Sequence, residues 1–232
     1  MWARRFTPDP LIWKKFCKRM PAKLYIIRHG ETVSNVAQVY QGAGDSPLTD
    51  NGILMAEELA EDLEDLDFKG IYCSDLSRAL KTAEIISRFH PVDPKIMEDL
   101  RERSYGEWEG LSFKQIAEQY VDVYREWMEN PANAKIPGAE SLDDLQMRAI
   151  RSLRHILEKH QDPTHNICIV GHGGINRALL FYFMGLGLNH FWRIRQSNSC
   201  INVVEFGKYP VVSLLNCTAH IKQAKVGRLP IY

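Results

Sequence analysis

Short apolar runs alternate with amphipathic helical patterns along most of this chain. The apolar runs occupy residues 24–27, 70–74, 166–170, 199–206 and 211–217. The helical patterns occupy residues 48–66, 75–89, 140–160 and the segment after 171, with shorter patches at 113–120 and 121–128. Strands that alternate with helices predict an α/β fold, in which a mostly parallel central sheet carries helices on both faces.

The length of the chain limits the number of domains that it can form. Its 232 residues, of which 45% are hydrophobic, suit one sizeable core. Residues 1–22 differ from the rest because they are rich in Lys and Arg, and Ile12, Phe16 and Met20 recur there at helical spacing. We therefore expect a basic N-terminal extension over 1–22 and a single domain over 23–232.

The balance of charge and the use of cysteine exclude several classes of protein. Lys+Arg and Asp+Glu both number 29, so no overall field attracts nucleic acid or an anionic membrane. The chain contains no run of eighteen apolar residues, so the sequence predicts no membrane span. The five cysteines include no C-x-x-C pair, which argues against a disulfide framework or a zinc site. These features predict a cytoplasmic protein, and they leave open whether it pairs as a homodimer.

Arginine and histidine side chains lie just after three of the predicted strands, where each strand ends. Arg28 and His29 follow the first strand, Ser74 and Arg78 follow the second, and residues 171–173, which read Gly-His-Gly, follow the third. Ligands of open α/β sheets bind at the carboxyl ends of the strands. If the three strands are neighbours, these groups converge on one site.

Two arginines and two histidines that meet at one point repel each other unless an anion lies between them. A phosphoryl group suits the site, because arginine matches phosphate oxygens with its planar fork and a helix N-terminus adds N–H donors. A neutral histidine in line with phosphorus can act as a nucleophile, while the other stabilises the charged transition state. The cationic side chains do the work of a metal, so we expect neither a metal nor a cofactor. The alternative is that Arg28 and His29 simply form the solvated end of a core strand.

Several short motifs resemble those of one family, and they occur in that family's order. The motifs are RHGET (28–32), QGAGDSPLTDNG (41–52), SDLSRALKTA (74–83), LRERSYGEWEG (100–110), PGAESL (137–142) and VGHGG (170–174). The chain resembles the histidine phosphatase superfamily, which includes cofactor-dependent phosphoglycerate mutases and related acid phosphatases. The resemblance runs from about residue 24 to residue 221.

The resemblance implies roles for particular side chains. His29 is similar to the phosphorylated nucleophile and His172 to the second histidine of the pocket, while Arg28 and Arg78 are similar to the arginines that clamp the phosphate. Glu102 is similar to the carboxylate that protonates the leaving oxygen and then deprotonates the attacking water. The phosphate-binding residues implied by the family motifs are Asn35, Gln41, Gly42 and Gly173. Glu107 and Glu109 lie close to Glu102 in sequence and could be mistaken for it.

The shorter motifs favour the phosphatase branch of this superfamily. GEWEG and PGAESL resemble α-ribazole phosphatase, metal-independent phosphoserine phosphatase and broad-specificity acid phosphatases, and the segment from Gly110 to Pro137 is shorter than in the mutases. The expected function is hydrolysis of a small phosphorylated metabolite through a phosphohistidine. The alternatives are a mutase-type phosphoryl transfer and a non-catalytic phosphate-binding module. A dinucleotide site is disfavoured, because Asn176 stands where the third glycine of that fingerprint belongs.

The resemblance implies no role for several other histidines and aromatic residues. The role of His220, structural or within the pocket, is open. The histidines near the end of the long helix are expected to be solvated: His155, His160 and His165. The aromatic residues that either line the substrate side or only pack are Tyr105, Trp108 and Trp127.

Overall fold

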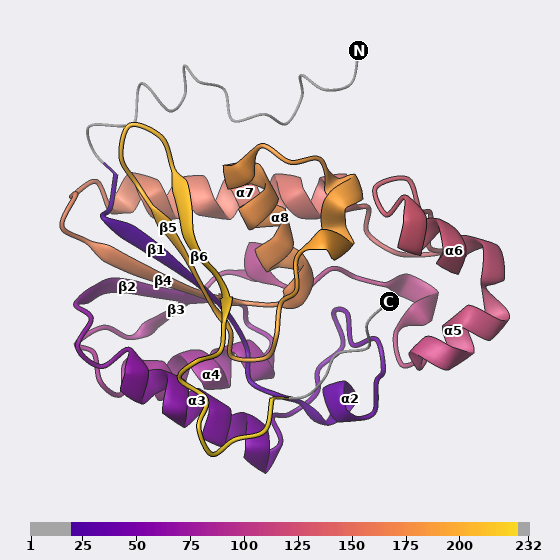
Figure 1. The fold of residues 1–232 in the computed structure, drawn as a ribbon, viewed down its shortest axis with the longest axis horizontal. Helices are drawn as coiled ribbons and strands as arrows, with labels where there is room; N and C mark the ends of the chain where they lie inside the picture. The colour runs from indigo at the N-terminus through magenta and orange to yellow at the C-terminus, as the bar shows by residue number, and fades with distance from the viewer. Residues whose placement is uncertain (1–19, 227–232) are drawn as a thin grey trace.

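A six-stranded sheet forms the centre of the protein, as the computed structural model shows for residues 20–226 (Figure 1). The strands are β1 (Lys23–Arg28), β2 (Phe68–Cys73), β3 (Pro94–Ile96), β4 (Asn166–Gly171), β5 (Ile201–Glu205) and β6 (Val211–Cys217), in the spatial order β3-β2-β4-β1-β5-β6. The pairs β3–β2, β2–β4 and β4–β1 are parallel, whereas β1–β5 and β5–β6 are antiparallel. The predicted mostly parallel sheet is confirmed.

Helices cover both faces of this sheet, as predicted. One face carries α3 (Asp50–Asp62) and α4 (Ser77–Ser87), and the other carries α7 (Leu142–Lys159) and α8 (Gly173–Met184) (Figure 1). Successive side chains of a strand point to opposite faces. Leu24 and Ile26 of β1 accordingly pack in the core beneath α7 and α8, while Tyr25 and Ile27 pack in the core beneath α3 and α4. This burial on both sides explains why residues 24–27 of the strand form a continuous apolar run.

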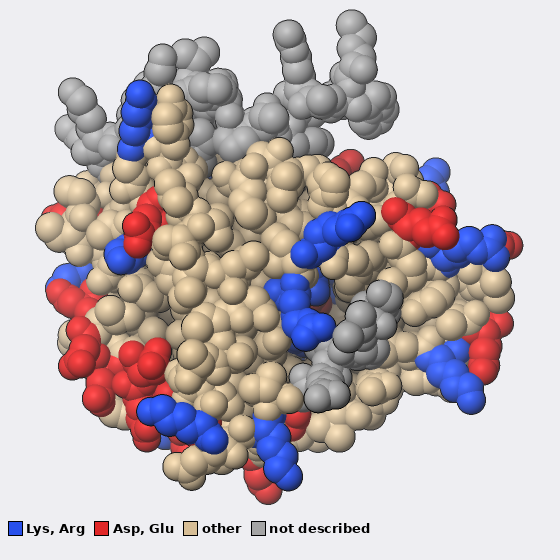
Figure 2. Space-filling model, in the orientation of Figure 1, with Lys and Arg blue, Asp and Glu red and all other residues tan. Residues whose placement is uncertain are grey.

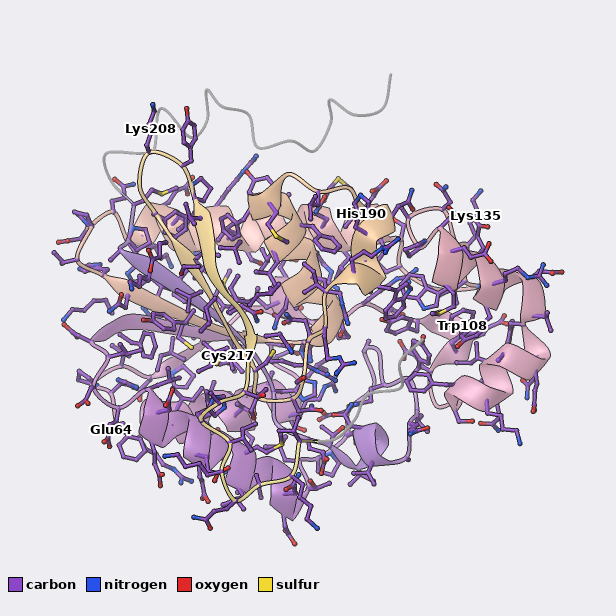
Figure 3. The ribbon with its side chains drawn as sticks, in the orientation of Figure 1. Glu64, Trp108, Lys135, His190, Lys208 and Cys217 are labelled. Carbon is purple, nitrogen blue, oxygen red and sulfur yellow. The ribbon has the colours of Figure 1, made fainter. Side chains whose placement is uncertain are left out.

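The segment between β3 and α7 lies beyond the carboxyl ends of the strands (Figure 1). It contains the 3-10 helices η1 (Glu98–Leu100) and η2 (Gly106–Trp108), followed by α5 (Phe113–Gln119) and α6 (Val121–Glu129). Both predicted helical patches are therefore confirmed. Trp108, labelled in Figure 3, and Trp127 are fully buried and pack this segment together rather than lining the substrate side.

Some elements differ from the prediction. The sequence gives no signal for β3, which has only three residues, or for α2 (Val33–Val36), which forms a single turn. The predicted helix over 48–66 is shorter, since α3 ends at Asp62. It begins at Asp50 because Thr49 caps it by accepting a hydrogen bond from the Gly52 N–H at 2.9 Å. A 3-10 helix, η3 (Leu188–Arg193), also links α8 to β5.

His160 corrects another expectation, because it is buried rather than solvated. Its Nε2 lies 2.9 Å from the hydroxyl of Tyr72, and its ring packs on Gly70, where a Cβ atom would lie 2.7 Å from Nε2. Burial lowers the pKa of His160 to about 4. His155 is exposed and His165 is partly exposed. The predicted basic helix around Ile12 and Phe16 lies outside the described residues.

Candidate active site

The carboxyl ends of β1, β2 and β4 meet at one place, because β4 pairs with both of the other strands. Arg28 of β1 is in register with Gly171 of β4, and Cys73 of β2 is in register with Val170. A pocket opens at these strand ends. It is lined by Arg28, His29, Asn35, Gln41, Gly42, Arg78, Glu102 and Gly173. The structure thus brings together the residues that the sequence predicted for the site, and His172 completes the group with a ring centroid 5.1 Å from that of His29.

His29 is held as a neutral ring with a defined tautomer. Its Nδ1 lies 2.7 Å from the carbonyl oxygen of Gly30. A carbonyl can only accept, so Nδ1 carries the proton and Nε2 keeps its lone pair. Burial, reinforced by the charges of Arg28 and Arg78, holds the pKa of His29 well below its usual value of 6.5. The ring therefore presents an unprotonated Nε2 at neutral pH.

His172 is held in the opposite tautomer. Arg78 Nε donates to His172 Nδ1 at 3.2 Å, and an arginine can only donate, so this nitrogen is unprotonated. The proton of the neutral ring then lies on Nε2, which is buried and has no hydrogen-bond partner among residues 20–226. Burial, together with the charges of Arg78, His29 and Arg28, lowers the pKa of His172 well below 6.5. His172 can therefore donate a hydrogen bond to an incoming anion.

Arg78 is fixed by its surroundings on every side. It is 1% exposed, and its Nη1 and Nη2 donate to the carbonyl oxygens of Gly44 and Gly42 at 2.8 and 2.9 Å. Burial lowers its pKa to about 10, so it stays charged at neutral pH. Gly42 is required here, because its φ is +56° and a Cβ would lie 2.1 Å from Glu109 Oε1. Arg28 is oriented by the carbonyl of Gln196, which accepts from its Nη1 at 2.6 Å.

Glu102 lies against the first turn of α8. Its two carboxylate oxygens accept from the Gly174 N–H at 3.1 and 2.9 Å, and Oε1 also accepts from the Arg103 N–H at 2.8 Å. A Cβ on Gly174 would lie 2.3 Å from Oε1, so the glycine allows this close approach. These three hydrogen bonds hold the Glu102 carboxyl group in place beside the pocket.

The neighbouring glutamates have other contacts. Glu109 Oε1 accepts from the backbone N–H groups of Ala43 and Tyr105, at 3.1 and 2.8 Å. Glu107 accepts from the hydroxyl of Tyr120 at 3.1 Å. Neither side chain lines the pocket, so the geometry distinguishes Glu102 from both.

Asn198, which the sequence did not single out, supports the loop after β1. Its Nδ2 lies 3.2 Å from the carbonyl oxygen of His29, 3.1 Å from that of Gly30 and 2.9 Å from Asn35 Oδ1. Asn35 Oδ1 also accepts from the Thr32 N–H at 3.1 Å, which leaves its amide nitrogen as the donor that can face the pocket. No motif surrounds Asn198, so only the fold reveals this contact.

Arg148 of α7 is a second residue that the sequence did not single out. Its guanidinium donates to the carbonyl oxygens of Asp99, Arg101 and Glu102 at 2.9, 2.6 and 3.0 Å. It also forms an ion pair with Glu140, with 2.6 Å between Nε and Oε1. Arg148 thus holds the backbone that carries Glu102.

The remaining wall of the pocket is aromatic and apolar with one further arginine. It consists of Val39, Tyr40, Tyr105, Phe113, Arg177 and Trp192, together with Gly174 of α8. His220 is buried outside this lining. In the part of the chain from 20 to 226, no group of three or more His, Cys, Asp or Glu side chains could hold a metal ion. No helix in the same part is long and apolar enough to cross a membrane.

Paired histidines and arginines at the strand ends of an α/β sheet are the arrangement expected of a phosphoryl-transfer enzyme. The chain belongs to the histidine phosphatase superfamily (branch 1), whose sequence model matches residues 24–218. It is therefore a phosphatase of this family.

Two named relatives and one solved structure are similar to this chain over most of their length. Phosphoserine phosphatase 1 of Hydrogenobacter thermophilus is 28% identical over 86% of this chain and 94% of its own. Adenosylcobalamin/alpha-ribazole phosphatase of Escherichia coli is 27% identical over 85% of this chain and 97% of its own. The structure of phosphoserine phosphatase from Entamoeba histolytica in complex with 3-phosphoglyceric acid is 28% identical, with a TM-score of 0.76, and the match covers 87% of this chain and 99% of that one. The prediction of the phosphatase branch is confirmed.

Proposed function

We propose that this protein hydrolyses small phosphomonoesters through a phosphohistidine on His29, without a metal. The observation that carries the proposal is the pair of opposite tautomers at the strand ends. His29 offers a lone pair at Nε2, whereas His172 offers an N–H at Nε2, and the ring centroids lie 5.1 Å apart. An anion between these rings meets a nucleophile on one side and a donor on the other.

In the first step, His29 Nε2 attacks phosphorus, so that an N–P bond forms and the P–O bond to the leaving group breaks. Arg28, Arg78 and the Nε2–H of His172 hold the non-bridging oxygens and stabilise the charge that spreads over them. The backbone N–H of Gly173 and the amide of Asn35 add neutral donors. Glu102, carrying a proton at this stage, transfers it to the departing alkoxide.

In the second step, water attacks the phosphohistidine. The Glu102 carboxylate now takes a proton from this water, an O–P bond forms and the N–P bond breaks. The products are inorganic phosphate and a neutral His29, with the proton returned to Glu102. The cycle consumes one water for each ester, and all charges balance.

The proposed substrate is a small phosphorylated metabolite. Phosphoserine, α-ribazole phosphate and 3-phosphoglyceric acid, the compounds in the names of the relatives, are the first candidates. We also propose a cytoplasmic location, which the free thiols of Cys73, Cys168, Cys200 and Cys217 support.

Turnover of para-nitrophenyl phosphate tests the proposed function. Wild-type enzyme should release nitrophenol at the same rate with and without EDTA, and His29→Ala should lose at least about a thousandfold in kcat because the nucleophile is gone. His155→Ala is the matched control, since His155 is exposed on α7. Loss of activity in EDTA, or a His29→Ala variant as active as this control, would refute the proposal.

A further inference from the structure

Residues 196–200, between η3 and β5, form a loop that is buried although it belongs to no helix or strand. The polar backbone groups of a buried loop need hydrogen-bond partners within the protein. This loop has them at the end of β1. The carbonyl oxygen of Gln196 accepts from Arg28 Nη1 at 2.6 Å, and the N–H of Ser199 donates to the carbonyl oxygen of His29 at 3.1 Å. The loop therefore supports both the phosphate clamp and the nucleophile.

A pair of buried amides, Gln196 and Asn202, holds this loop against the sheet. Asn202 Nδ2 donates to Gln196 Oε1 at 3.0 Å, and Gln196 Nε2 donates back to Asn202 Oδ1 at 2.9 Å. Asn202 Nδ2 also donates to the carbonyl oxygen of Ile26 at 2.8 Å, and its Oδ1 accepts from the Asn216 N–H at 2.8 Å. Asn202, on β5, thereby ties the loop to β1 on one side and to β6 on the other.

The amide pair determines where the carbonyl oxygen of Gln196 lies. The second Nε2 hydrogen of Gln196 is donated to the carbonyl of Arg195 at 3.0 Å, so the polar atoms of both amides are paired. A buried polar network that is satisfied in this way specifies one geometry, which apolar side chains of similar shape do not. Gln196 thus gives its side chain to the network and its backbone carbonyl to Arg28. A displacement of Gln196 moves the acceptor that orients the guanidinium.

We propose that Asn202 and Gln196 are positioning residues for Arg28, and that they set the affinity of the site for a phosphoryl group. This inference rests on the proposed function, in which Arg28 clamps the phosphate. An arginine binds two phosphate oxygens at once only when its planar fork is correctly oriented. Neither amide lines the pocket, so their effect on phosphate passes through the Gln196 carbonyl.

The affinity for inorganic phosphate tests the inference. Asn202→Leu and Gln196→Met each keep the approximate volume of the side chain and remove its amide. Each should raise the Kd of phosphate about 10-fold, because the fork of Arg28 loses its orientation. Titration calorimetry at a temperature where the protein is folded measures this Kd without turnover.

Gln146→Met is the matched control. Gln146 is buried on α7, where its Nε2 donates to the carbonyl oxygen of Ala178 at 3.0 Å, and it lies outside the pocket lining. All three variants lose a buried hydrogen bond and should melt at a lower temperature, but the control should keep the wild-type Kd of phosphate. An unchanged Kd in Asn202→Leu, or an equal rise in Gln146→Met, would overturn the inference.

Combination with Arg28→Lys shows whether the amides act through Arg28. Arg28→Lys removes the fork and should itself weaken phosphate binding. Because the amides orient that fork, adding Asn202→Leu to Arg28→Lys should weaken binding no further. Losses that simply add would overturn the inference. If Asn202→Leu fails to fold, the same comparison with Gln196→Met decides. A wild-type enzyme that binds no phosphate and hydrolyses no ester would refute the proposed function itself.

Discussion

Two histidine rings at the strand ends carry their protons on opposite nitrogens, and the fold imposes this difference through single contacts. The carbonyl of Gly30 takes the Nδ1 proton of His29, whereas Nε of Arg78 donates to Nδ1 of His172. One arginine therefore has two effects, because it positions His172 and its charge helps to keep both rings neutral. A lysine at position 78 could not hold the carbonyls of Gly42 and Gly44 and His172 with the same rigid geometry.

The role of Glu102 can be tested by the chemistry of the leaving group. A serine alkoxide needs a proton as its bond breaks, whereas a nitrophenolate leaves readily without one. Glu102→Gln should therefore slow phosphoryl transfer from phosphoserine by about 10²–10⁴-fold, and transfer from para-nitrophenyl phosphate far less. Single-turnover kinetics would measure this step without the later hydrolysis of the phosphohistidine.

Glu107→Gln is the control for this comparison. Glu107 lies five residues away but contacts Tyr120 outside the pocket, so its substitution should show no selectivity between the two esters. Equal losses on both esters in Glu102→Gln would leave Glu102 as a positioning residue with no acid role.

At the scale of elements, the active site depends on contacts between segments far apart in sequence. Asn198, just before β5, supports the loop after β1. Arg148 of α7 supports the backbone of Glu102. The first turn of α8 receives the Glu102 carboxylate. The charged groups are therefore held by rigid strands and helices, which keeps them in place before a ligand binds.

The contact between β2 and α7 predicts a pH dependence of stability. His160 follows α7 and is buried against Tyr72 and Gly70 of β2, and burial lowers its pKa to about 4. The positive charges of His165, Lys95 and Lys159 contribute to this shift. The unfolded chain binds this proton near pH 6.5, whereas the folded chain does not. The contribution of His160 to stability is therefore complete above about pH 6.5 and is lost as the pH falls towards 4.

Urea unfolding at pH 7.5 and pH 5.0 would measure this contribution. The free energy of unfolding of the wild type should be lower at pH 5.0, and His160→Gln should show a smaller difference between the two pH values. His155→Gln, which changes an exposed histidine of the same helix, should behave as the wild type. A difference as large in His160→Gln as in the wild type would contradict the explanation.

At the scale of the whole molecule, the charges of the surface are unevenly placed although the formal net charge is zero. On the face shown in Figure 2, acidic side chains gather over the end of α3 that lies away from α2, while Lys and Arg side chains lie near the middle of the face. The positive charges that the mechanism uses lie deeper, in Arg28 and Arg78. Recognition of an anion is therefore a local property of the pocket, as the balanced composition predicts.

The sequence predicts the sheet and the charged groups at its strand ends, because apolar strands and their order determine where Arg28, His29 and His172 emerge. It also predicts Glu102, through a family motif. It does not predict Asn198, Arg148 or Arg177, because their contacts depend on how segments pack in three dimensions. Asn198, for example, reaches a loop 163 residues away along the chain. It misplaces His160, since helical spacing alone does not show that the end of α7 is covered by β2.

Trapping of the covalent intermediate is the measurement that tests the mechanism most directly. The enzyme would be exposed briefly to phosphate-labelled para-nitrophenyl phosphate, quenched in alkali and digested, and the labelled peptide sequenced by mass spectrometry. We expect one acid-labile, base-stable phosphoryl group, on a ring nitrogen of His29. Label on His172 or on any other residue, or single turnovers that release phosphate with no labelled protein at any time, would contradict the assignment of His29 as the nucleophile.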